Sequence, residues 1–498
     1  MLASEAGPVK IIILGGGLSG LTCGLTLIKA GHEVIILEKE DELGGLARSY
    51  RKGHFTFDYG PHFLFSPKVV EVLSSLLERD FSAELLKLRG FKGKMYFDHR
   101  YFNFPFEPKN LFSNINRIKL PPILLSFLFA QMRGSDDLNV TNVNTWIKNR
   151  VGNKLYEYTN LGHYIEKLYG LSTEKISKDW GIQKLKFLNN ISLRNLTKKI
   201  LSDDHFGKKG IFYPQTGIDY LSISLGSAIA QKGGKILLQS EASEIINHRK
   251  KVEVAFHDQH STDVIHGDFL ISTLPIGELI KILKHTPSDL LAAATNLRNR
   301  TLLTLFLMIN RESITKHGCI YFSEKRFPFK RMTEFRNISP IAAPEGKTSL
   351  CIEMTCEEGE AICPEEIKEE IFKKVISNLE KDKFLHERDV DEYILKTMPF
   401  AYPVYDLSYL ENLSKILGYL ASLNNIVTLG RNGLFTYNTM ANSIRSAYIL
   451  SQRLSETGQK EMSKIISDFY SARIEKYSKI PLGLSYRPNE MLLFQETL

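Results

Sequence analysis

The sequence predicts an α/β protein built around a parallel sheet, and three observations in its first forty residues carry this prediction. Residues 10–14 (Lys-Ile-Ile-Ile-Leu) form a short β-branched run typical of a strand buried on both faces. A glycine-rich turn, Gly15-Gly16-Gly17-Leu18-Ser19-Gly20, follows directly, and residues 21–30 then show helical spacing of apolar side chains. A second apolar run, residues 33–37, ends at Glu38. Strand, glycine turn, helix and strand in this order indicate the β-α-β unit of a Rossmann-like domain.

The glycine turn fits the pattern G-x-G-x-x-G, and each position has a physical reason. Gly15 permits the tight turn, Gly17 has no Cβ where a pyrophosphate must approach the backbone, and Gly20 lets the helix pack closely on the strand. The first turn of the helix offers unpaired N–H groups to the phosphates. Glu38, 18 positions after Gly20, stands where an acid would bind ribose hydroxyls, which favours an unphosphorylated ribose over NADP. The sequence therefore predicts a dinucleotide site.

Two further segments narrow the choice of dinucleotide. Leu43-Gly44-Gly45-Leu46-Ala47-Arg48-Ser49 suits a second loop closing over the same ligand, and Phe57-Asp58-Tyr59-Gly60-Pro61-His62-Phe63 follows it. These residues resemble the FAD-binding amine oxidase superfamily, and within it the branch that holds protoporphyrinogen oxidase-like proteins and UDP-galactopyranose mutases. In that family a double glycine follows the ribose acid, and Gly-Pro-His or Gly-Ala-His lies beside the flavin ring. The resemblance implies FAD rather than NAD, with His62 beside the flavin as the candidate catalytic residue.

The same resemblance is clear near the C-terminal end, in Gly430-Arg431 and the aromatic turn that leads to Thr439-Met440-Ala441. It implies that Arg431 lies near the ribityl and phosphate chain, and that residues 439–441 begin a helix facing the pyrimidine end of the flavin. This block contains no cysteine, so we expect non-covalent FAD. The predicted cofactor-binding residues are Gly15, Gly17, Leu18, Ser19, Gly20, Glu38, Lys39, Gly44, Gly45, Leu46, Ala47, Arg48, Gly60, Pro61, His62, Ala242, Gly430, Arg431, Thr439, Met440 and Ala441.

The patterns between these blocks divide the chain into interleaved parts. Residues 1–70, 209–282 and 395–455 are predicted to form the FAD-binding domain, which is thus split along the chain. Residues 71–208 (helical, from 142 to 201 almost throughout) and 283–394 (largely strands) are predicted to form an α+β substrate domain, and 456–498 a C-terminal helix and tail. We also expect a helical pattern over 68–88 and two short strands over 94–106.

Candidate substrate residues are less specific than the cofactor residues. Arg331 and Arg336, predicted to lie between strands, suit an anionic group such as a diphosphate, although solvated surface charge is the favoured interpretation for each alone. Tyr402 and Tyr405 precede the final block and are further candidates. Lys184 stands where the family often has an arginine, and because lysine cannot bind in bidentate fashion we assign it no ligand role.

Composition sets outer limits on the function. The 498 residues are 43% hydrophobic with a formal charge of +8, which suits an anionic ligand such as a nucleotide sugar. No basic cluster is interleaved with aromatic residues, so we predict no nucleic-acid partner. The five cysteines show no metal-site spacing, and we expect a reduced cytoplasmic protein with neither disulfides nor a metal site. The sequence makes no prediction of oligomeric state.

Residues 120–130 (Leu-Pro-Pro-Ile-Leu-Leu-Ser-Phe-Leu-Phe-Ala) are strongly apolar but too short to span a bilayer. With Arg117, Lys119 and Arg133 outside the run, it is either a helix packed within its own domain or one lying in a membrane interface. We favour the packed helix.

Three functions remain open. The favoured one is a FAD-dependent oxidoreductase taking hydride or electrons from a C–N or C–C bond of a small molecule. The second is a redox-neutral flavin-dependent UDP-sugar mutase of the galactopyranose type. The third is a binding protein of the same fold without flavin catalysis, like the Rab escort and GDP-dissociation inhibitor group. The intact segments around His62 and Arg431 argue against the third.

Overall fold

The computed structural model describes residues 7–133, 139–185, 188, 210–357, 365–457 and 459–479. At its centre is a five-stranded, wholly parallel sheet in the order β19-β13-β1-β2-β9. All of the strands except the partly exposed edge strand β9 are largely buried apolar runs, as expected for a parallel sheet covered on both faces. The predicted α/β class is confirmed. The bounds are β1 Lys10–Leu14, β2 Glu33–Leu37, β9 Lys235–Leu237, β13 Phe269–Ser272 and β19 Ile426–Thr428.

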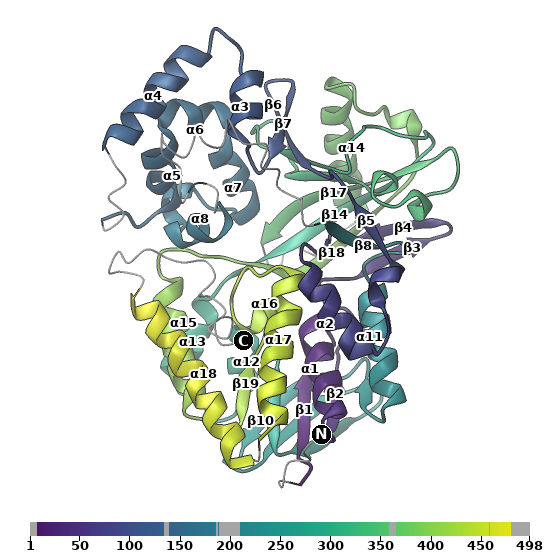
Figure 1. Cartoon of the computed structure of the whole chain (residues 1–498), viewed down its shortest axis with the longest axis vertical. Helices are drawn as coiled ribbons and strands as arrows, with labels where there is room; N and C mark the ends of the chain where they lie inside the picture. The colour runs from purple at the N-terminus through teal and green to yellow at the C-terminus, as the bar shows by residue number, and fades with distance from the viewer. Residues whose placement is uncertain are drawn as a thin grey trace.

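Helices from distant segments cover this sheet in the lower half of the molecule (Figure 1). The first helix, α1, packs between α11 and α17, and Cys23 on α1 lies 3.5 Å from the backbone oxygen of Ala447 on α17. The beginning and the end of the described chain are thereby brought together at the sheet. The covering helices are α1 Leu18–Lys29, α2 Pro67–Leu77, α11 Tyr220–Gln231, α12 Ile276–Ile282, α13 Ser288–Asn296, α15 Tyr409–Ala421, α16 Gly430–Gly433, α17 Met440–Ser455 and α18 Gln459–Lys479.

Three small antiparallel assemblies lie outside the central sheet, the first in this lower half and the other two beside the strands of the upper half (Figure 1). The strands β10 (Glu241–Asn247), β11 (Val252–His257) and β12 (Thr262–Gly267) form a meander. The others are the hairpin of β3 (Ser49–Lys52) with β4 (Phe55–Asp58), and the pair of β5 (Leu85–Leu88) with β8 (Ile211–Pro214).

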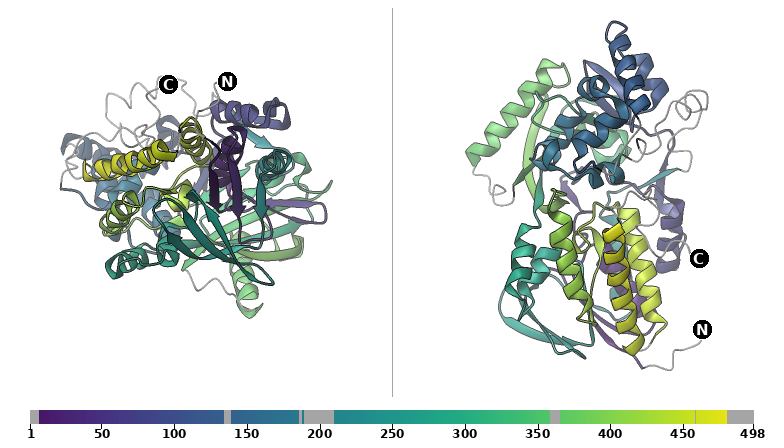
Figure 2. Two further views of the ribbon diagram at one scale, coloured as in Figure 1. Left: turned by 90° about the horizontal axis from the view of Figure 1, so that it is seen from below. Right: turned by 90° about the vertical axis from the view of Figure 1, so that its left-hand side faces the viewer.

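The upper half holds a seven-stranded sheet in the order β18-β14-β17-β16-β15-β6-β7, covered by α14. Beside it lies a group of helices, α3 to α8, which the turned views in Figure 2 show as a separate layer. These elements are α3 Pro108–Asn114, α4 Leu120–Arg133, α5 Val143–Val151, α6 Asn153–Thr159, α7 Leu161–Tyr169, α8 Lys178–Lys184, α14 Glu365–Lys381, β6 Gly93–Phe97, β7 Arg100–Phe104, β14 Asn299–Ile309, β15 Cys319–Phe322, β16 Arg331–Glu334, β17 Thr348–Glu357 and β18 Val390–Pro403.

Two sequence predictions need correction. The helical pattern over 68–88 holds only to Leu77, because Asp80 then caps a 3-10 turn through the backbone N–H of Ser82, and residues 85–88 pair as a strand with β8. Arg331 does not lie between strands but opens β16, opposite Glu353 on β17. The helical prediction for 186–201 falls outside the described residues, apart from Leu188.

Among the described residues, no helix combines the length and apolar character needed to cross a membrane. The same residues contain no cluster of histidine, cysteine and acidic side chains suited to a metal ion. Among their cysteines, Cys23, Cys319 and Cys351 are buried free thiols.

Candidate functional site

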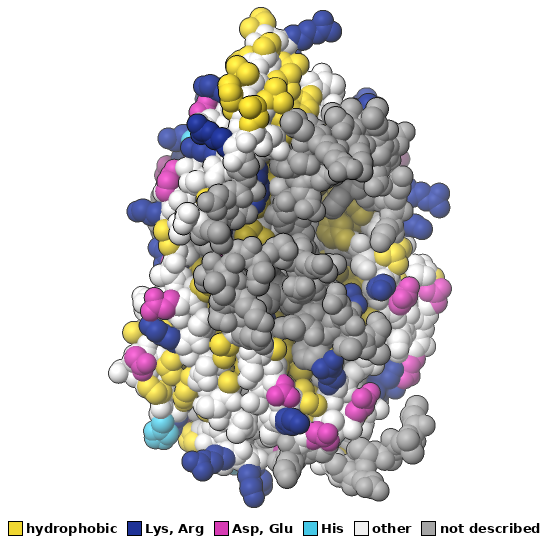
Figure 3. Space-filling view, turned by 60° about the vertical axis from the view of Figure 1, so that its left-hand side comes forward, with side chains coloured by type: hydrophobic (Ala, Val, Ile, Leu, Met, Phe, Trp, Pro, Cys, Tyr) yellow, Lys and Arg dark blue, Asp and Glu magenta, His cyan; other side chains and the backbone are white. Residues whose placement is uncertain are grey.

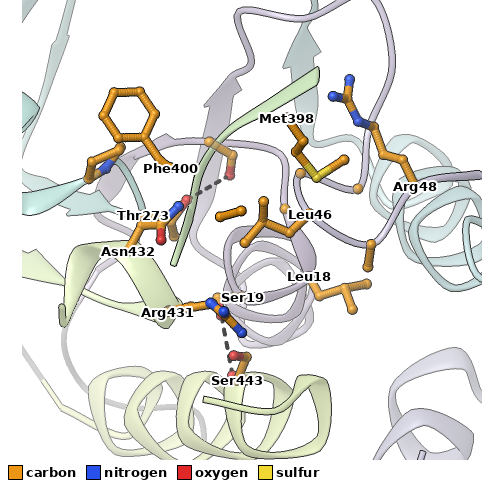
Figure 4. A pocket seen from close by; sticks show the side chains of 18 of the residues that line it. Leu18, Ser19, Leu46, Arg48, Thr273, Met398, Phe400, Arg431, Asn432 and Ser443 are labelled. Atoms are coloured by element: carbon orange, nitrogen blue, oxygen red, sulfur yellow. Dashed lines mark hydrogen bonds between the residues drawn. The ribbon is translucent and has the colours of Figure 1, made fainter. Parts of the chain in front are cut away.

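A cavity of about 480 Å³ lies at the carboxyl ends of β1, β2 and β13, beneath the upper half of the molecule. Figure 4 shows Leu18, Leu46, Met398 and Arg431, which come from distant parts of the sequence, gathered around it. Most residues predicted for the site line this one cavity. They are Gly15, Gly17, Leu18, Ser19, Glu38, Lys39, Gly44, Gly45, Leu46, Ala47, Arg48, Pro61, His62, Ala242, Arg331, Tyr402, Gly430, Arg431, Thr439 and Met440.

The glycine turn forms one wall of the cavity and begins α1. Gly17 is the N-cap of this helix, so the unpaired N–H groups of the first helical turn lie at the cavity. A Cβ on Gly17 would have no protein atom closer than Gly45 Cα at 3.8 Å, so the turn lies close to the second glycine loop without being packed against it. Gly20 is not in the lining. A Cβ there would lie 2.1 Å from the Gly15 oxygen, which fits the predicted close packing of helix and turn.

Glu38 closes the second strand beside this turn. Its carboxylate accepts a 2.7 Å hydrogen bond from the backbone N–H of Gly16 and a 3.0 Å bond from that of Glu40. The side chain is buried yet lines the cavity. These two bonds fix the carboxylate and leave it acceptor capacity for ligand hydroxyls.

Arg431 reaches the cavity from the short helix α16, which follows β19. Its guanidinium donates a 3.1 Å hydrogen bond to the Asn438 oxygen and stands 5.0 Å from the ring centre of Tyr402 and 4.1 Å from that of Tyr437. Its buried Nε has no hydrogen-bond partner, and the same holds for Nε of Arg48 on the loop after β2. Buried donors without partners are rare, and these two lie where a dinucleotide would lie along the helix N-terminus. The residues present therefore fit the predicted cofactor.

A buried ionic group stands behind the cavity wall. Glu353, wholly inaccessible to solvent, accepts hydrogen bonds from Arg331 (Nε 2.5 Å, Nη2 2.6 Å) and from Lys330 (3.0 Å), while Lys330 also donates to the Tyr402 hydroxyl at 2.8 Å. Burial alone would raise the pKa of Glu353, but the two cations outweigh it and lower the pKa to about 2. Glu353, Lys330 and Arg331 together carry one net positive charge. Arg331 and Tyr402 of this group line the cavity.

His62 lies in the same wall, after Gly60 and Pro61. Burial, and then the charge of Arg331, lower the pKa of His62 to about 4, so its ring is neutral at pH 7. Its Nδ1 is buried and has no hydrogen-bond partner in the structure. The ring therefore offers the cavity an uncharged nitrogen that can accept or donate a proton, depending on its tautomer.

Other candidates lie away from the lining. Tyr405 is buried, with its ring stacked 4.5 Å from that of Tyr409, and its hydroxyl accepts a 3.0 Å bond from the backbone N–H of Tyr437. Arg336 donates hydrogen bonds to the backbone oxygens of Pro344 and Lys347. It therefore stabilises a loop and takes no part in the cavity. Gly60 and Ala441 lie next to lining residues but are not in the lining themselves.

Several lining residues were not predicted from the sequence. Met398 and Phe400 come from β18, just before the Tyr402 segment, and nothing in their local pattern marks them. Thr273 follows β13 and could have been found, because a residue ending a strand of this sheet lies at the same edge as the glycine turn. Lys184, given no role above, does line the cavity, with its ammonium 3.3 Å from the ring centre of Tyr437.

The parallel sheet, the glycine cradle and the ribose acid together define a dinucleotide-binding α/β protein with a chamber of arginine and tyrosine side chains beside the cofactor site. Residues 18–398 match the model of the family described as flavin containing amine oxidoreductase. The chain belongs to this family, and FAD is its cofactor. The predicted superfamily is confirmed.

The similarity to individual known proteins is either short or low in sequence identity. A curated 4,4'-diapophytoene desaturase of Staphylococcus aureus (strain COL) is 34% identical over 93 residues, which is 18% of each chain. The match thus spans about a fifth of that relative. The crystal structure of reduced UDP-galactopyranose mutase superposes with a TM-score of 0.76 at 19% identity, over 91% of this chain and 99% of the other. A protoporphyrinogen oxidase-like protein from Exiguobacterium sp. 255-15 has a TM-score of 0.69 at 14% identity, over 91% and 99%. At these identities the structures show a shared fold.

Proposed function

We propose that this protein is a FAD-dependent oxidoreductase that takes a hydride, or its electrons, from a C–N or C–C bond of a small-molecule substrate. One observation carries the proposal. In a member of a flavin-containing oxidoreductase family, the cavity that offers a dinucleotide cradle continues to a neutral histidine and an arginine held by a buried carboxylate. The lining contains no cysteine among the described residues, which supports dissociable FAD.

Each residue has a proposed part. The N–H groups that open α1 hold the pyrophosphate, and Glu38 binds a ribose. The backbone near Ala242, at the start of β10, lies beside the adenine. Bound FAD supplies the hydride-accepting ring. The N-terminus of α17, capped by Thr439 through Asn442 N–H at 3.3 Å, and the charge of Arg431 stabilise negative charge nearby.

His62 and Arg331 are proposed to act on the substrate. Because the pKa of His62 is lowered to about 4, its Nδ1 binds or moves a proton without charge repulsion from Arg331 at neutral pH. Arg331 is fixed by Glu353 in a bidentate pair, so it can orient an anionic or carbonyl group of the substrate. Tyr402, held by Lys330, directs its ring to the same space.

A second candidate function has a specific observation in its favour. Lys184, Arg331 and Arg431 bring three cations to one cavity lined on the same side by Tyr402 and Tyr437. This arrangement suits a diphosphate as well as a carboxylate. The alternative is therefore a redox-neutral mutase acting on a nucleotide sugar, with the flavin kept reduced.

Absorbance spectroscopy of the purified protein separates these functions. We expect a flavin spectrum, released by acid denaturation because the FAD is not covalently attached. The reduced protein is then exposed to air, and in a second sample to UDP-galactopyranose without oxygen. Rapid reoxidation in air, by protein that leaves the sugar unchanged, supports the oxidoreductase, whereas isomerised sugar with no net flavin oxidation establishes the mutase. Protein that binds no FAD even when it is supplied contradicts both.

The remaining sequence predictions stay proposals. Cys23, Cys319 and Cys351 are free thiols, as in proteins of a reducing compartment, and this supports a cytoplasmic location. The predicted FAD-binding domain, residues 1–70, 209–282 and 395–455, includes all five strands of the central sheet. The substrate that we propose for the cavity is a small molecule, and we propose no nucleic-acid partner.

A further inference from the structure

The helix α4, Leu120–Arg133, exposes an apolar face at the outer end of the helical layer. Two of its side chains, Ile123 and Phe127, are buried against the molecule, where α4 packs on α5 and α6. The opposite face is open to solvent and consists of large apolar side chains. Their exposed fractions are Leu124 38%, Leu125 56%, Leu128 41%, Phe129 56% and Met132 78%, and Ile118, just before the helix, reaches 86%.

This exposure follows from the helical pattern and is continuous. At about 3.6 residues per turn, positions 121, 125, 128 and 132 fall on one line along the helix, with 124 and 129 on either side of it. No polar or charged side chain interrupts that surface between residues 120 and 130. A helix that is apolar on both faces is normally buried on both, and contiguous exposed apolar patches mark interaction sites.

The charges on α4 and on its approach from residue 108 all have one sign, while acidic residues stand just outside this stretch, at Glu107 and at Asp136 and Asp137. Residues 108–133 contain Lys109, Arg117, Lys119 and Arg133 but no acidic residue. Arg117 and Arg133 are exposed at the two ends of α4, while Lys119 donates a hydrogen bond to Asp98 at 2.9 Å. Figure 3 shows the hydrophobic side chains gathered at the upper end of the molecule with Lys and Arg side chains beside them.

We propose that α4 docks this protein on an anionic lipid surface, with its outer apolar face in the membrane interface and its terminal arginines at the headgroups. Apolar side chains on one face with cations at the edges are the composition of an interfacial helix. The 14 residues of α4 extend about 21 Å, shorter than the roughly 30 Å hydrocarbon core, so the helix lies along the surface rather than across it. The proposal does not rest on the proposed function, because α4 contributes no residue to the cavity.

Charge argues for lipid over a second copy of the chain. In a symmetric dimer through α4, the arginines of one copy would face those of the other, and α4 itself carries no carboxylate to pair with them, since Asp136 and Asp137 follow only beyond its end. The face is also one helix wide, which is narrow beside the roughly 800 Å² per partner of a standard interface. An anionic bilayer supplies negative charge for the arginines, and its apolar layer can cover a narrow face without a matching protein surface.

Vesicle flotation of the flavin-loaded protein tests the proposal. Vesicles are made of phosphatidylcholine alone or of phosphatidylcholine mixed with phosphatidylserine. We expect the protein to float with the mixed vesicles. The double variant Leu125→Ser/Phe129→Ser should bind them about tenfold more weakly or worse, because two large side chains no longer enter the lipid. Arg117→Gln/Arg133→Gln should lose the preference for phosphatidylserine.

The control is Ile341→Ser/Leu407→Ser, which removes two side chains of similar exposure, 51% and 55%, away from α4. It should float like the wild type. All variants should keep their flavin content and melting temperature, because every substituted side chain faces solvent. A wild-type protein that stays at the bottom of the gradient overturns the proposal, as does equal binding by the Leu125/Phe129 variant. Sedimentation of the wild type as a dimer that this variant dissociates would also overturn it, in favour of a second copy.

Discussion

Gly17 is the residue at which the cofactor and the fold can be tested separately. Its φ of −75° and ψ of 173° are ordinary for alanine, and a Cβ would meet no protein atom closer than 3.8 Å. We therefore expect Gly17→Ala to fold with a stability change within about 1 kcal/mol, the scale of an N-cap substitution. The added methyl group stands where the pyrophosphate would approach, so FAD affinity should fall about tenfold or more.

Equilibrium titration with FAD and thermal melting of the apoprotein measure the two effects. Gly418→Ala is the matched control, because Gly418 is exposed on α15 and an added Cβ there would meet no atom within 4 Å. This control should leave FAD affinity unchanged. Unaltered FAD binding by Gly17→Ala would remove the glycine turn from the cofactor site.

Glu353 is the second residue whose replacement has a defined consequence. It neutralises one of the two cations Arg331 and Lys330, and all three side chains are removed from solvent or nearly so. Glu353→Gln would leave both cations without a counter-charge, and breaking such a buried pair typically costs about 3–5 kcal/mol. Denaturant unfolding measures the loss. Glu411→Gln, which breaks an exposed pair with Lys415, is the control and should scarcely change stability. Equal stability of Glu353→Gln and wild type would mean that the cations find other partners.

At the scale of elements, the turn between β15 and β16 is held by a single side chain of α7. The Lys167 ammonium lies within 3.4 Å of four backbone oxygens of this turn, those of Phe322, Glu324, Phe327 and Phe329. Lys330 and Arg331 follow immediately in the chain. Lys167 thus positions the segment that carries two cations of the site, although it does not line the cavity itself.

Lys167→Met should loosen this turn. Four partly buried carbonyl groups would lose their shared donor, at a cost of about 3 kcal/mol or more. We expect faster amide hydrogen exchange over residues 323–331 than in the wild type, while the central sheet stays protected. Lys154→Met, which breaks an exposed pair with Glu157 on α6, serves as the control. Unchanged exchange in the turn of Lys167→Met would show that the hairpin holds its shape without the lysine.

At the scale of the whole molecule, the sequence predicted what is local and missed what depends on register between distant strands. The β-α-β unit is predictable because strand, turn, helix and acid follow one another within forty residues. The pairing of Arg331 with Glu353 is not, since it depends on how β16 and β17 align. Met398 lines the cavity only because of the path that β18 takes past it, which the local sequence does not reveal. The exposed face of α4 was hidden for another reason, because an apolar run looks alike whether one or both of its faces are covered.

Asp58 joins distant segments of the molecule and should make its stability depend on pH. The buried carboxyl of Asp58 accepts hydrogen bonds from Ser49 Oγ (2.7 Å), Tyr213 Oη (2.8 Å) and the Ile218 N–H (3.1 Å), and so links β3, β4, β8 and the approach to α11. Burial raises its pKa to about 7, although these hydrogen bonds oppose the shift. The folded state therefore binds the proton more tightly than the unfolded chain, whose ordinary value is 3.8.

The sign of the effect follows by linkage. The contribution of Asp58 to stability is fully present below about pH 4, and it is lost as the pH rises to about 7, where the folded protein must ionise a buried group. Asp58→Asn keeps a neutral side chain of the same shape at every pH. We therefore expect the melting temperature of the wild type, relative to that of Asp58→Asn, to fall steadily between about pH 4 and pH 7 and to level off above that range. A difference between the two proteins that stays constant over this range would mean that Asp58 is already ionised in the folded state at low pH, with its three donors outweighing the cost of burial.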